Sequence, residues 1–379
     1  MPGQAITLDV SATDPIAALR RAGSMRNSNR VRKIAVAVAM LAAAGAAAIV
    51  APGVIQKFGD AFVRALHADP GWVVGGVGFE LASFMGYIAL FWYVANRATA
   101  RIGLRASGEI ALASTAATRL LPTAGAGGAA LTFWSLRRAG QDNTTATRTL
   151  LSFLVVLYSV FLGSIVVAGT LLATGIVASD VPFSLSAVPA AGAALGIGLA
   201  LLLALRHDAD AVPPGRIGKA SHALGGAVRD ALSIVRRPDA RLIGAVAWWA
   251  FDLFVLWATF NAFGEPPAAT VLVLGYFLGQ VANTVPLPGA ASGGMVGAFL
   301  ALGMPAEVVL PAVLAYRAIA IWTPVPAGAA ALAGLRRRVR VWAEEDGVVV
   351  TEAELDDATV IPMPSRVPVP NHGTMPLAA

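Results

Sequence analysis

The chain has 379 residues, of which 57% are hydrophobic and only 13% are charged, and it contains no cysteine. Soluble domains are about 25% charged, so this composition is typical of an integral membrane protein. The absence of cysteine excludes disulfides, thiolate metal sites and cysteine nucleophiles. The formal net charge is +6, and most Lys and Arg residues lie beside apolar segments, which favours contact with lipid headgroups over nucleic acid.

Six apolar runs are long enough to cross the ~30 Å hydrocarbon core, which needs about 20 residues. They predict spanning helices at 34–52, 72–95, 150–177, 185–205, 242–263 and 306–335. The first run follows a long, Arg-rich polar segment and lacks a convincing cleavage site, so we expect a retained helix and not a signal peptide. We expect residues 1–32 to be a disordered cytoplasmic segment and residues 33–338 to form one polytopic membrane domain.

Two further apolar stretches, 109–136 and 268–303, are broken in the middle by Pro and Gly. The Arg-rich loops are predicted to be cytoplasmic, because positive residues favour that side. With this constraint the first stretch begins and ends inside, and the second begins and ends outside. We therefore predict an all-α integral membrane protein with six spanning helices and two oppositely oriented re-entrant hairpins, as in the inverted repeats of transporters.

Between Arg206 and Arg241 the apolar residues recur at helical spacing. They predict an amphipathic helix at about 219–237, lying on the cytoplasmic membrane surface. The alternative is a short cytosolic helix packed on its own loops. Residues 339–379 are acidic and then Pro-rich, and we expect them to be a disordered cytoplasmic tail, too short for an enzyme domain.

Both broken stretches contain the pattern Pro-x4-Gly-Gly, which also occurs once at the start of an ordinary span. Its residues in the two hairpins are Pro122, Gly127 and Gly128, and Pro288, Gly293 and Gly294. Proline removes an amide donor and glycine permits unusual dihedral angles, so the pattern predicts a break in the helix. At membrane depth the freed backbone groups need protein or a wet cavity around them. The alternative is close helix packing through small residues.

Four charged residues lie within apolar runs: Glu80, Arg119, Asp252 and Arg317. Each costs at least ~2.5–3.5 kcal/mol at the centre of a span, and such residues are by default functional. Two guanidinium groups beside half-helix N-termini suit an anionic group such as a lipid phosphate. The two carboxyl groups are then partners of the arginines or proton carriers. The alternative is that all four form structural ion pairs.

Signals for an enzyme are poor. The four histidines lack metal-ligand spacing, and no nucleophile elbow is present. The glycines at 125–128 are not a dinucleotide motif, since no strand precedes them. We therefore expect no catalytic residues, no metal and no cofactor.

The second hairpin and the last span carry the clearest motifs, at 285–289, 293–297, 316–328 and 335–337. As a set they resemble the flippase-like membrane-domain family of lysylphosphatidylglycerol synthases, over roughly residues 72 to 342. The resemblance implies an eight-helix membrane domain with two re-entrant elements, associated with moving aminoacylated or other anionic lipids between leaflets. The positions that match its motifs are Pro122, Gly127, Gly128, Pro288, Gly289, Gly293, Gly294, Tyr316 and Arg317.

The chain departs from that family in two ways. Many members carry an acidic residue in the glycine segment, but here Ala290, Ala291 and Ser292 follow Gly289, and the next acid is Glu307. The synthases also carry an aminoacyl-transfer domain, so we expect this chain to be a stand-alone member.

These observations predict a protein of the inner or plasma membrane, with both termini cytoplasmic, that moves an anionic lipid between leaflets. The headgroup is expected between the hairpin tips, held by Arg119 and Arg317, with Glu80 and Asp252 also in the site. The expected partners are membrane lipids, with no nucleic acid, and a second copy or an envelope-biosynthesis protein. The alternative is a non-transporting scaffold of a cell-envelope lipid or glycan transferase; an intramembrane enzyme ranks last.

Overall fold

The computed structural model describes residues 69–120, 125–208, 214–285 and 289–346. The chain divides into two compact units, residues 1–60 and 61–379, and every described residue belongs to the second. The described residues form helices and no strands. The predicted span at 34–52 lies outside the described residues, as do Pro122 and Pro288.

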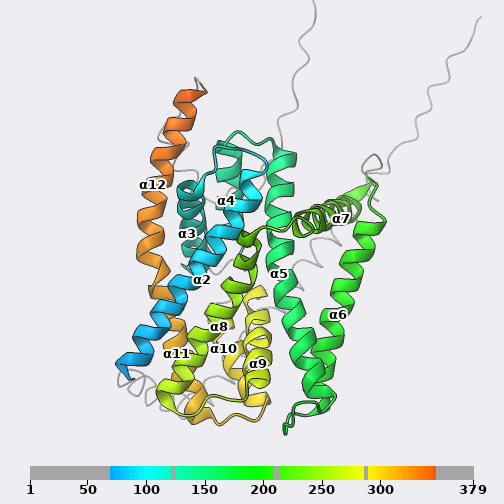
Figure 1. Ribbon diagram of the computed structural model, residues 1–379, viewed down its shortest axis with the longest axis vertical. Coiled ribbons are helices and arrows are strands. Elements are labelled where there is room, and N and C mark those ends of the chain that lie inside the picture. Colours follow the sequence, from blue (N-terminus) through cyan, green and yellow to red (C-terminus); the bar gives the residue numbers. More distant parts are fainter. Residues whose placement is uncertain (1–68, 121–124, 209–213, 286–288, 347–379) are drawn as a thin grey trace, which may run out of the picture. The chain divides into compact units, whose positions relative to one another are not determined.

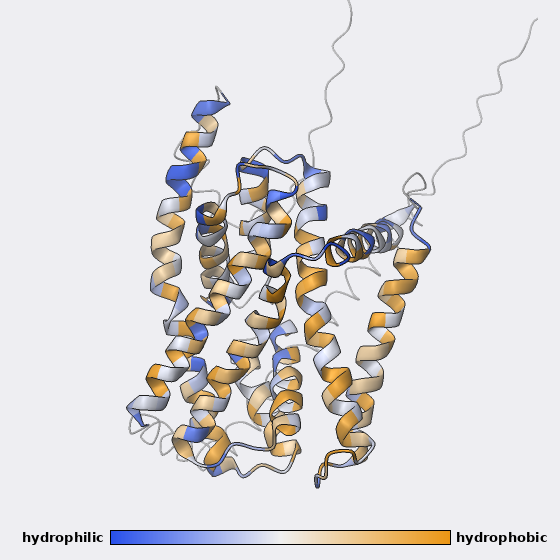
Figure 2. Cartoon of the chain, in the orientation of Figure 1, coloured by the Kyte–Doolittle hydropathy of each residue, from blue (hydrophilic) through white to orange (hydrophobic). Residues whose placement is uncertain are grey.

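Within the described ranges, five helical segments are long and apolar enough to cross a membrane, and they overlap five of the six predicted spans. They are α2 (Pro70–Asn96), α5 (Asn143–Ala173), α6 (Phe183–Leu205), η1 with α8 (Ala240–Leu242, Ile243–Phe263), and α11 with α12 (Ala306–Trp322, Pro324–Glu345). Asp69 caps α2 and Asp142 caps α5, each by accepting a hydrogen bond from a backbone amide of the first turn. Apolar residues dominate α5, α6 and α8, whereas the end of α12 is hydrophilic (Figure 2).

Among the described residues, four short α-helices and one short 3-10 helix form two hairpins. The first consists of α3 (Leu104–Leu120) and α4 (Ala126–Arg138); the second consists of α9 (Ala269–Val281), the short η2 (Ala282–Thr284) and α10 (Ala290–Ala301). In each hairpin the two helices pack against each other. The first hairpin lies in the upper half of Figure 1 and the second in the lower half. Each helix has 17 residues or fewer, which is short for a span that needs about 20.

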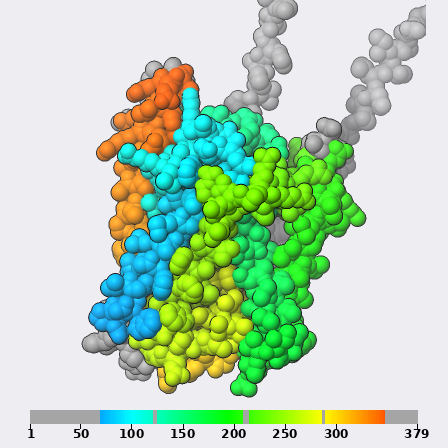
Figure 3. Space-filling model, in the orientation of Figure 1, coloured from blue at the N-terminus to red at the C-terminus, as the bar shows by residue number. Residues whose placement is uncertain are grey.

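Helix α7 (Gly215–Val235) occupies the segment in which an amphipathic helix was expected. It packs on α5 and α6 and lies across their axes on the surface of the molecule (Figures 1 and 3). Its buried face includes Ala227, Val228 and Ala231, while Leu224 and Val235 of the same predicted stripe are exposed. Part of the apolar stripe of α7 therefore packs against the rest of the protein, and part of it is exposed on the outer surface.

Helices α2 and α8 form the central pair of the described unit, with α11 against α8. Gly86 and Gly244 lie where α2 and α8 cross, and a Cβ atom on either would meet backbone atoms of the other helix. Such close approach through small residues is a common way for membrane helices to associate. Phe84 and Trp248 pack edge to face, with ring centroids 5.3 Å apart.

Helix α12 runs along α3 and is joined to it at several levels. A Cβ atom on Gly328 would meet Ala116 and the backbone of Leu112, so the two helices touch there. Farther along, Arg338 donates to both carboxylate oxygens of Glu109, at 2.6 and 2.9 Å. Helix α12 continues to residue 345, so the predicted start of the tail at 339 lies within a helix; residues 347–379 lie outside the described part.

Candidate functional site

Three of the four intramembrane charges predicted from the sequence meet in the fold. Arg119 Nη2, at the end of α3, lies 3.7 Å from Glu80 Oε1 on α2 and 3.9 Å from Asp252 Oδ1 on α8. The side chains of Glu80, Asp252 and Arg119 are 0%, 3% and 14% exposed. Both distances exceed the usual 2.7–3.2 Å of an N–H···O bond, so the attraction is chiefly electrostatic.

The second oxygen of Asp252 collects hydrogen bonds from two other helices. Tyr316 on α11 donates to Asp252 Oδ2 at 2.7 Å, and the hydroxyl of Tyr276 on α9 donates to the same oxygen. Gln280, one turn beyond Tyr276, donates to Asp252 Oδ2 at 3.5 Å and to the Tyr316 hydroxyl at 3.1 Å. Both tyrosines are fully buried. The hydroxyl and amide donors therefore stabilise a negative charge on Asp252.

Glu80 has a different environment. Within the described residues, neither of its carboxyl oxygens accepts a hydrogen bond, and both are buried. Asp252 Oδ1 is likewise without a hydrogen-bond donor in this part of the chain. Burying a carboxylate without hydrogen bonds is unfavourable, because the charge loses its hydration. The two carboxyl groups of the cluster are thus not equivalent.

Arg317, the fourth predicted charge, does not join this cluster. Its Nε donates to Ser292 Oγ of α10 at 3.2 Å, and no carboxylate of the described residues forms an ion pair with it. Ser292 is the third residue of α10, whose first amides have no partner within the helix. The guanidinium and the positive end of a helix dipole therefore meet at the start of α10.

The two hairpins break at the places that the Pro-x4-Gly-Gly pattern predicted. Helix α4 begins directly after Gly125, and α10 directly after Gly289, and both glycines have a positive φ. A Cβ atom on Gly128 would meet Ser114 and Thr118 of α3, and one on Gly294 would meet Ala282 of η2. The last glycine of each pattern therefore lets the two helices of the hairpin pack closely, which is the alternative role of small residues at helix contacts.

The other glycines of the pattern behave differently. Gly293 faces open space, with nothing within 4 Å of a Cβ atom built on it. Gly127 is buried at the start of α4. The third match to the pattern, at Pro70, occupies the first turn of α2, where proline is well tolerated, and α2 continues without a break.

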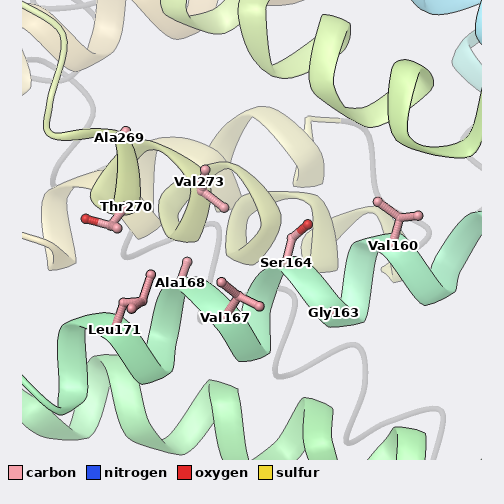
Figure 4. A pocket seen from close by; sticks show the side chains of 9 residues that line it. All are labelled: Val160, Gly163, Ser164, Val167, Ala168, Leu171, Ala269, Thr270 and Val273. Atoms are coloured by element: carbon pink, nitrogen blue, oxygen red, sulfur yellow. The ribbon is translucent and has the colours of Figure 1, made fainter. Parts of the chain in front are cut away.

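An apolar groove of about 510 Å³ lies between α5 and α9 (Figure 4). Its walls are formed by Val160, Gly163, Ser164, Val167, Ala168 and Leu171 of α5 and by Ala269, Thr270 and Val273 of α9. Thr270 Oγ1 is buried and has no hydrogen-bond partner in the described structure. The lining suits hydrocarbon, and the groove reaches the helix α9 that carries Tyr276 and Gln280.

Sequence reasoning missed Tyr276 and Gln280 as members of the site. They are four residues apart on α9 and so lie on one face of the helix. A hydroxyl and an amide at this spacing within an apolar run are the signal that was available. Ser292 was noted only because an acidic residue is expected near it.

Comparison with known proteins gives one family. The family model described as "Lysylphosphatidylglycerol synthase TM region" matches residues 33–328, which is more than half of the chain. The matched range contains every residue of the charged cluster, both hairpins and Arg317. No curated protein matches the chain.

Proposed function

The chain belongs to the family of the lysylphosphatidylglycerol synthase transmembrane region, and from this premise we propose that it moves a phosphate-bearing lipid between the leaflets of the cell membrane. The part of the chain that the structure describes contains five helical segments long and apolar enough to cross a bilayer, so the chain is a multi-pass membrane protein. The matched region is a membrane domain, so the proposal assigns it transport and not catalysis. We place both termini on the cytoplasmic side, following the Arg-rich loops.

The proposal depends on Arg317, a cation within an apolar helix that has no carboxylate partner among the described residues. A guanidinium within an apolar helix is expensive, and it is normally compensated by a carboxylate or used for function. Arg317 has only the neutral Ser292 hydroxyl as a hydrogen-bond partner in the described structure. Next to the N-terminus of α10, it offers the planar donors and positive potential that a phosphate group requires. We assign the headgroup contact to Arg317, and to Arg119 a role within the carboxylate cluster.

The two hairpins define the proposed path of the lipid headgroup across the membrane. In the proposed topology α3–α4 and α9–α10 are re-entrant, one from each face. Arg119 lies near the end of α3 and Ser292 near the start of α10. Discontinuous helices of this kind line the substrate sites of many transporters. The acyl chains remain in the bilayer and along the apolar groove between α5 and α9, which presents almost no polar surface to them.

One observation favours the scaffold alternative. Arg119 lies beside Glu80 and Asp252, as expected if the intramembrane charges serve only to hold helices together. The same explanation does not extend to Arg317, which has no acidic partner in the described helices. The two functions therefore differ most sharply in what they expect of Arg317.

The first test is lipid retention. We would purify the full chain in mild detergent and identify co-purifying lipids by mass spectrometry for the wild type, Arg317→Ala, Arg317→Lys and Arg206→Ala. Arg206, at the exposed end of α6, is the matched control. We expect one anionic lipid class to be enriched at least several-fold in the wild type and the control, reduced in Arg317→Lys and lost in Arg317→Ala. An unchanged lipid profile in all four proteins would contradict the headgroup site.

The second test measures movement. Proteoliposomes containing phosphatidylglycerol with a fluorescent headgroup-proximal label are treated with a membrane-impermeant reductant, which bleaches only the outer leaflet. We expect bleaching to exceed half of the label with wild-type protein and to stay near half with Arg317→Ala. If folded wild-type protein behaves like protein-free vesicles, with or without an imposed ion gradient, the scaffold function is the better explanation.

A further inference from the structure

We propose that the Glu80–Arg119–Asp252 cluster is a proton-binding site, with the proton carried by the carboxyl group of Glu80. In the reaction, one O–H bond of a hydronium ion breaks and leaves water, while an O–H bond forms between that proton and one oxygen of the Glu80 carboxylate. The proposal concerns a ligand of the cluster itself, and it does not depend on whether lipid is moved.

The charge balance of the cluster favours one bound proton. If all three side chains were ionised, two carboxylates would share one guanidinium nitrogen, Arg119 Nη2, and the cluster would carry an uncompensated negative charge. The Glu80 and Asp252 side chains are 0% and 3% exposed, so water does not compensate that charge. One bound proton brings the cluster to neutrality.

Hydrogen bonding decides which carboxyl group takes the proton. Asp252 Oδ2 accepts from the Tyr276 and Tyr316 hydroxyls and from Gln280, and these donors stabilise the anionic form. Both Glu80 oxygens are buried without any donor in the described structure. A neutral carboxylic acid tolerates such a place far better than a carboxylate does. The proton therefore resides on Glu80.

The surroundings of Glu80 support a proton over a larger cation. The charged groups beside it are Arg119 from α3 and Asp252 from α8, and Tyr276 from α9 and Tyr316 from α11 contact Asp252 on its other oxygen. Across the described residues, no group of three or more acidic or histidine side chains forms a metal site. Arg119 Nη2 already lies within 4 Å of one carboxyl oxygen of each residue, and it supplies the positive charge that a metal ion would otherwise bring.

The arrangement gives the proton a mechanical consequence. With Glu80 neutral, Arg119 has one anionic partner, Asp252, and that pair links the first hairpin to α8. Once Glu80 releases its proton, two carboxylates on α2 and α8 attract the same guanidinium. Proton binding thus changes the forces on the end of α3, which carries Arg119 to the hairpin break.

The test is infrared difference spectroscopy on the full chain in nanodiscs of ether-linked phosphatidylglycerol and phosphatidylcholine, which lack ester carbonyls. A protonated, buried carboxyl group gives a distinct C=O stretching band that shifts in D2O. We expect this band at neutral pH in the wild type and in Glu109→Gln, and its loss in Glu80→Gln. Glu109 is the matched control, because it is a mostly buried glutamate ion-paired with Arg338 outside the cluster. In Asp252→Asn the band is also lost, since Glu80 then pairs with Arg119 as a carboxylate.

An identical band in the wild type and in folded Glu80→Gln would overturn the proposal. If Glu80→Gln does not fold, Glu80→Asp replaces it. This variant keeps a carboxyl group on a shorter side chain, so the band must move in frequency, and a band that does not move likewise excludes Glu80. No lipid movement is measured in this experiment, so its failure and the failure of the transport proposal are distinguishable.

Discussion

Gly125 and Gly289 adopt nearly the same left-handed backbone conformation, with φ and ψ of 83° and −8° in the first and 79° and −4° in the second. Each is the residue directly before the second helix of a hairpin. The two glycines are 164 positions apart in the sequence (289 − 125), yet the second helix of each hairpin starts in the same way. Both hairpins therefore use a left-handed glycine to start their second helix.

The shared conformation predicts a specific response to substitution. Nothing lies within 4 Å of a Cβ atom at either glycine, so only backbone strain opposes a side chain there. We expect Gly125→Ala and Gly289→Ala each to lower the free energy of unfolding by about 1–2 kcal/mol. Asparagine tolerates left-handed dihedral angles better, and it should recover part of the loss. Thermal unfolding in detergent measures the effect; Gly75→Ala in α2, also without neighbours, should not be destabilising.

A second prediction concerns two adjacent glycines of α10. A Cβ atom on Gly294 would meet Ala282, whereas one on Gly293 would meet nothing within 4 Å. We expect Gly294→Ala to force the hairpin open and to destabilise the fold by about 1–3 kcal/mol, as overpacking does. Gly293→Ala should leave the unfolding temperature unchanged or raise it, because alanine favours helix. Equal effects of the two substitutions would mean that α10 does not pack on η2 as described.

The donors to Asp252 give a third prediction. Tyr316→Phe removes a hydrogen bond to a buried carboxylate while keeping the ring, and we expect a loss of about 1.5–3 kcal/mol of stability. Tyr158→Phe is the control, because Tyr158 is 47% exposed. A double mutant with Asp252→Asn isolates the pair. If the Tyr316→Phe effect is the same with and without Asp252, the hydrogen bond contributes nothing to stability.

A fourth prediction concerns pH and the contact between His207, at the end of α6, and His222 of α7, whose ring centroids are 4.4 Å apart. Burial lowers the pKa of His207, and His222, Arg229 and Arg148 nearby lower it further. The unfolded chain therefore binds a proton more readily at this residue. The contribution of His207 to the free energy of unfolding is complete above the pKa of histidine in the unfolded chain, about 6.5. This contribution is lost as the pH falls below that value.

The measurement is the unfolding temperature of the detergent-solubilised chain between pH 8 and pH 5. We expect the wild type to lose more stability over this range than His207→Gln does. The His222→Gln variant should lie between them, because one of the groups that lower the pKa of His207 is gone. Parallel curves for the wild type and His207→Gln would contradict the assignment.

The spans and the breaks were predictable because they depend on patterns within single segments. Apolar length places five of the six predicted helices, and the Pro-x4-Gly-Gly pattern places both hairpin breaks, although Pro122 and Pro288 themselves lie outside the described residues. The expectation that intramembrane charges associate holds for Glu80, Arg119 and Asp252. An unpaired charge within hydrocarbon is costly, so oppositely charged side chains tend to pair whatever the packing of the surrounding helices.

What the sequence did not provide is the rotation of each helix. Tyr316 and Arg317 are neighbours in sequence, yet they point to different helices, Tyr316 to Asp252 on α8 and Arg317 to Ser292 on α10. Arg119 and Arg317 looked equivalent, and only the packing separates them. Tyr276 and Gln280 escaped notice because neutral polar groups are inexpensive in an apolar run, so composition does not single them out.

Gly328 and Arg338 attach α12 to α3 at two levels, and the chain passes from α12 to α11 through Thr323. Helix α3 is therefore fastened along its length to α12, and α12 follows directly on α11 in the chain. Arg119 lies on α3 and Arg317 lies on α11. Arg119 and Arg317 are therefore connected by packed helices and by the covalent chain, without any direct contact between the two side chains in the described structure.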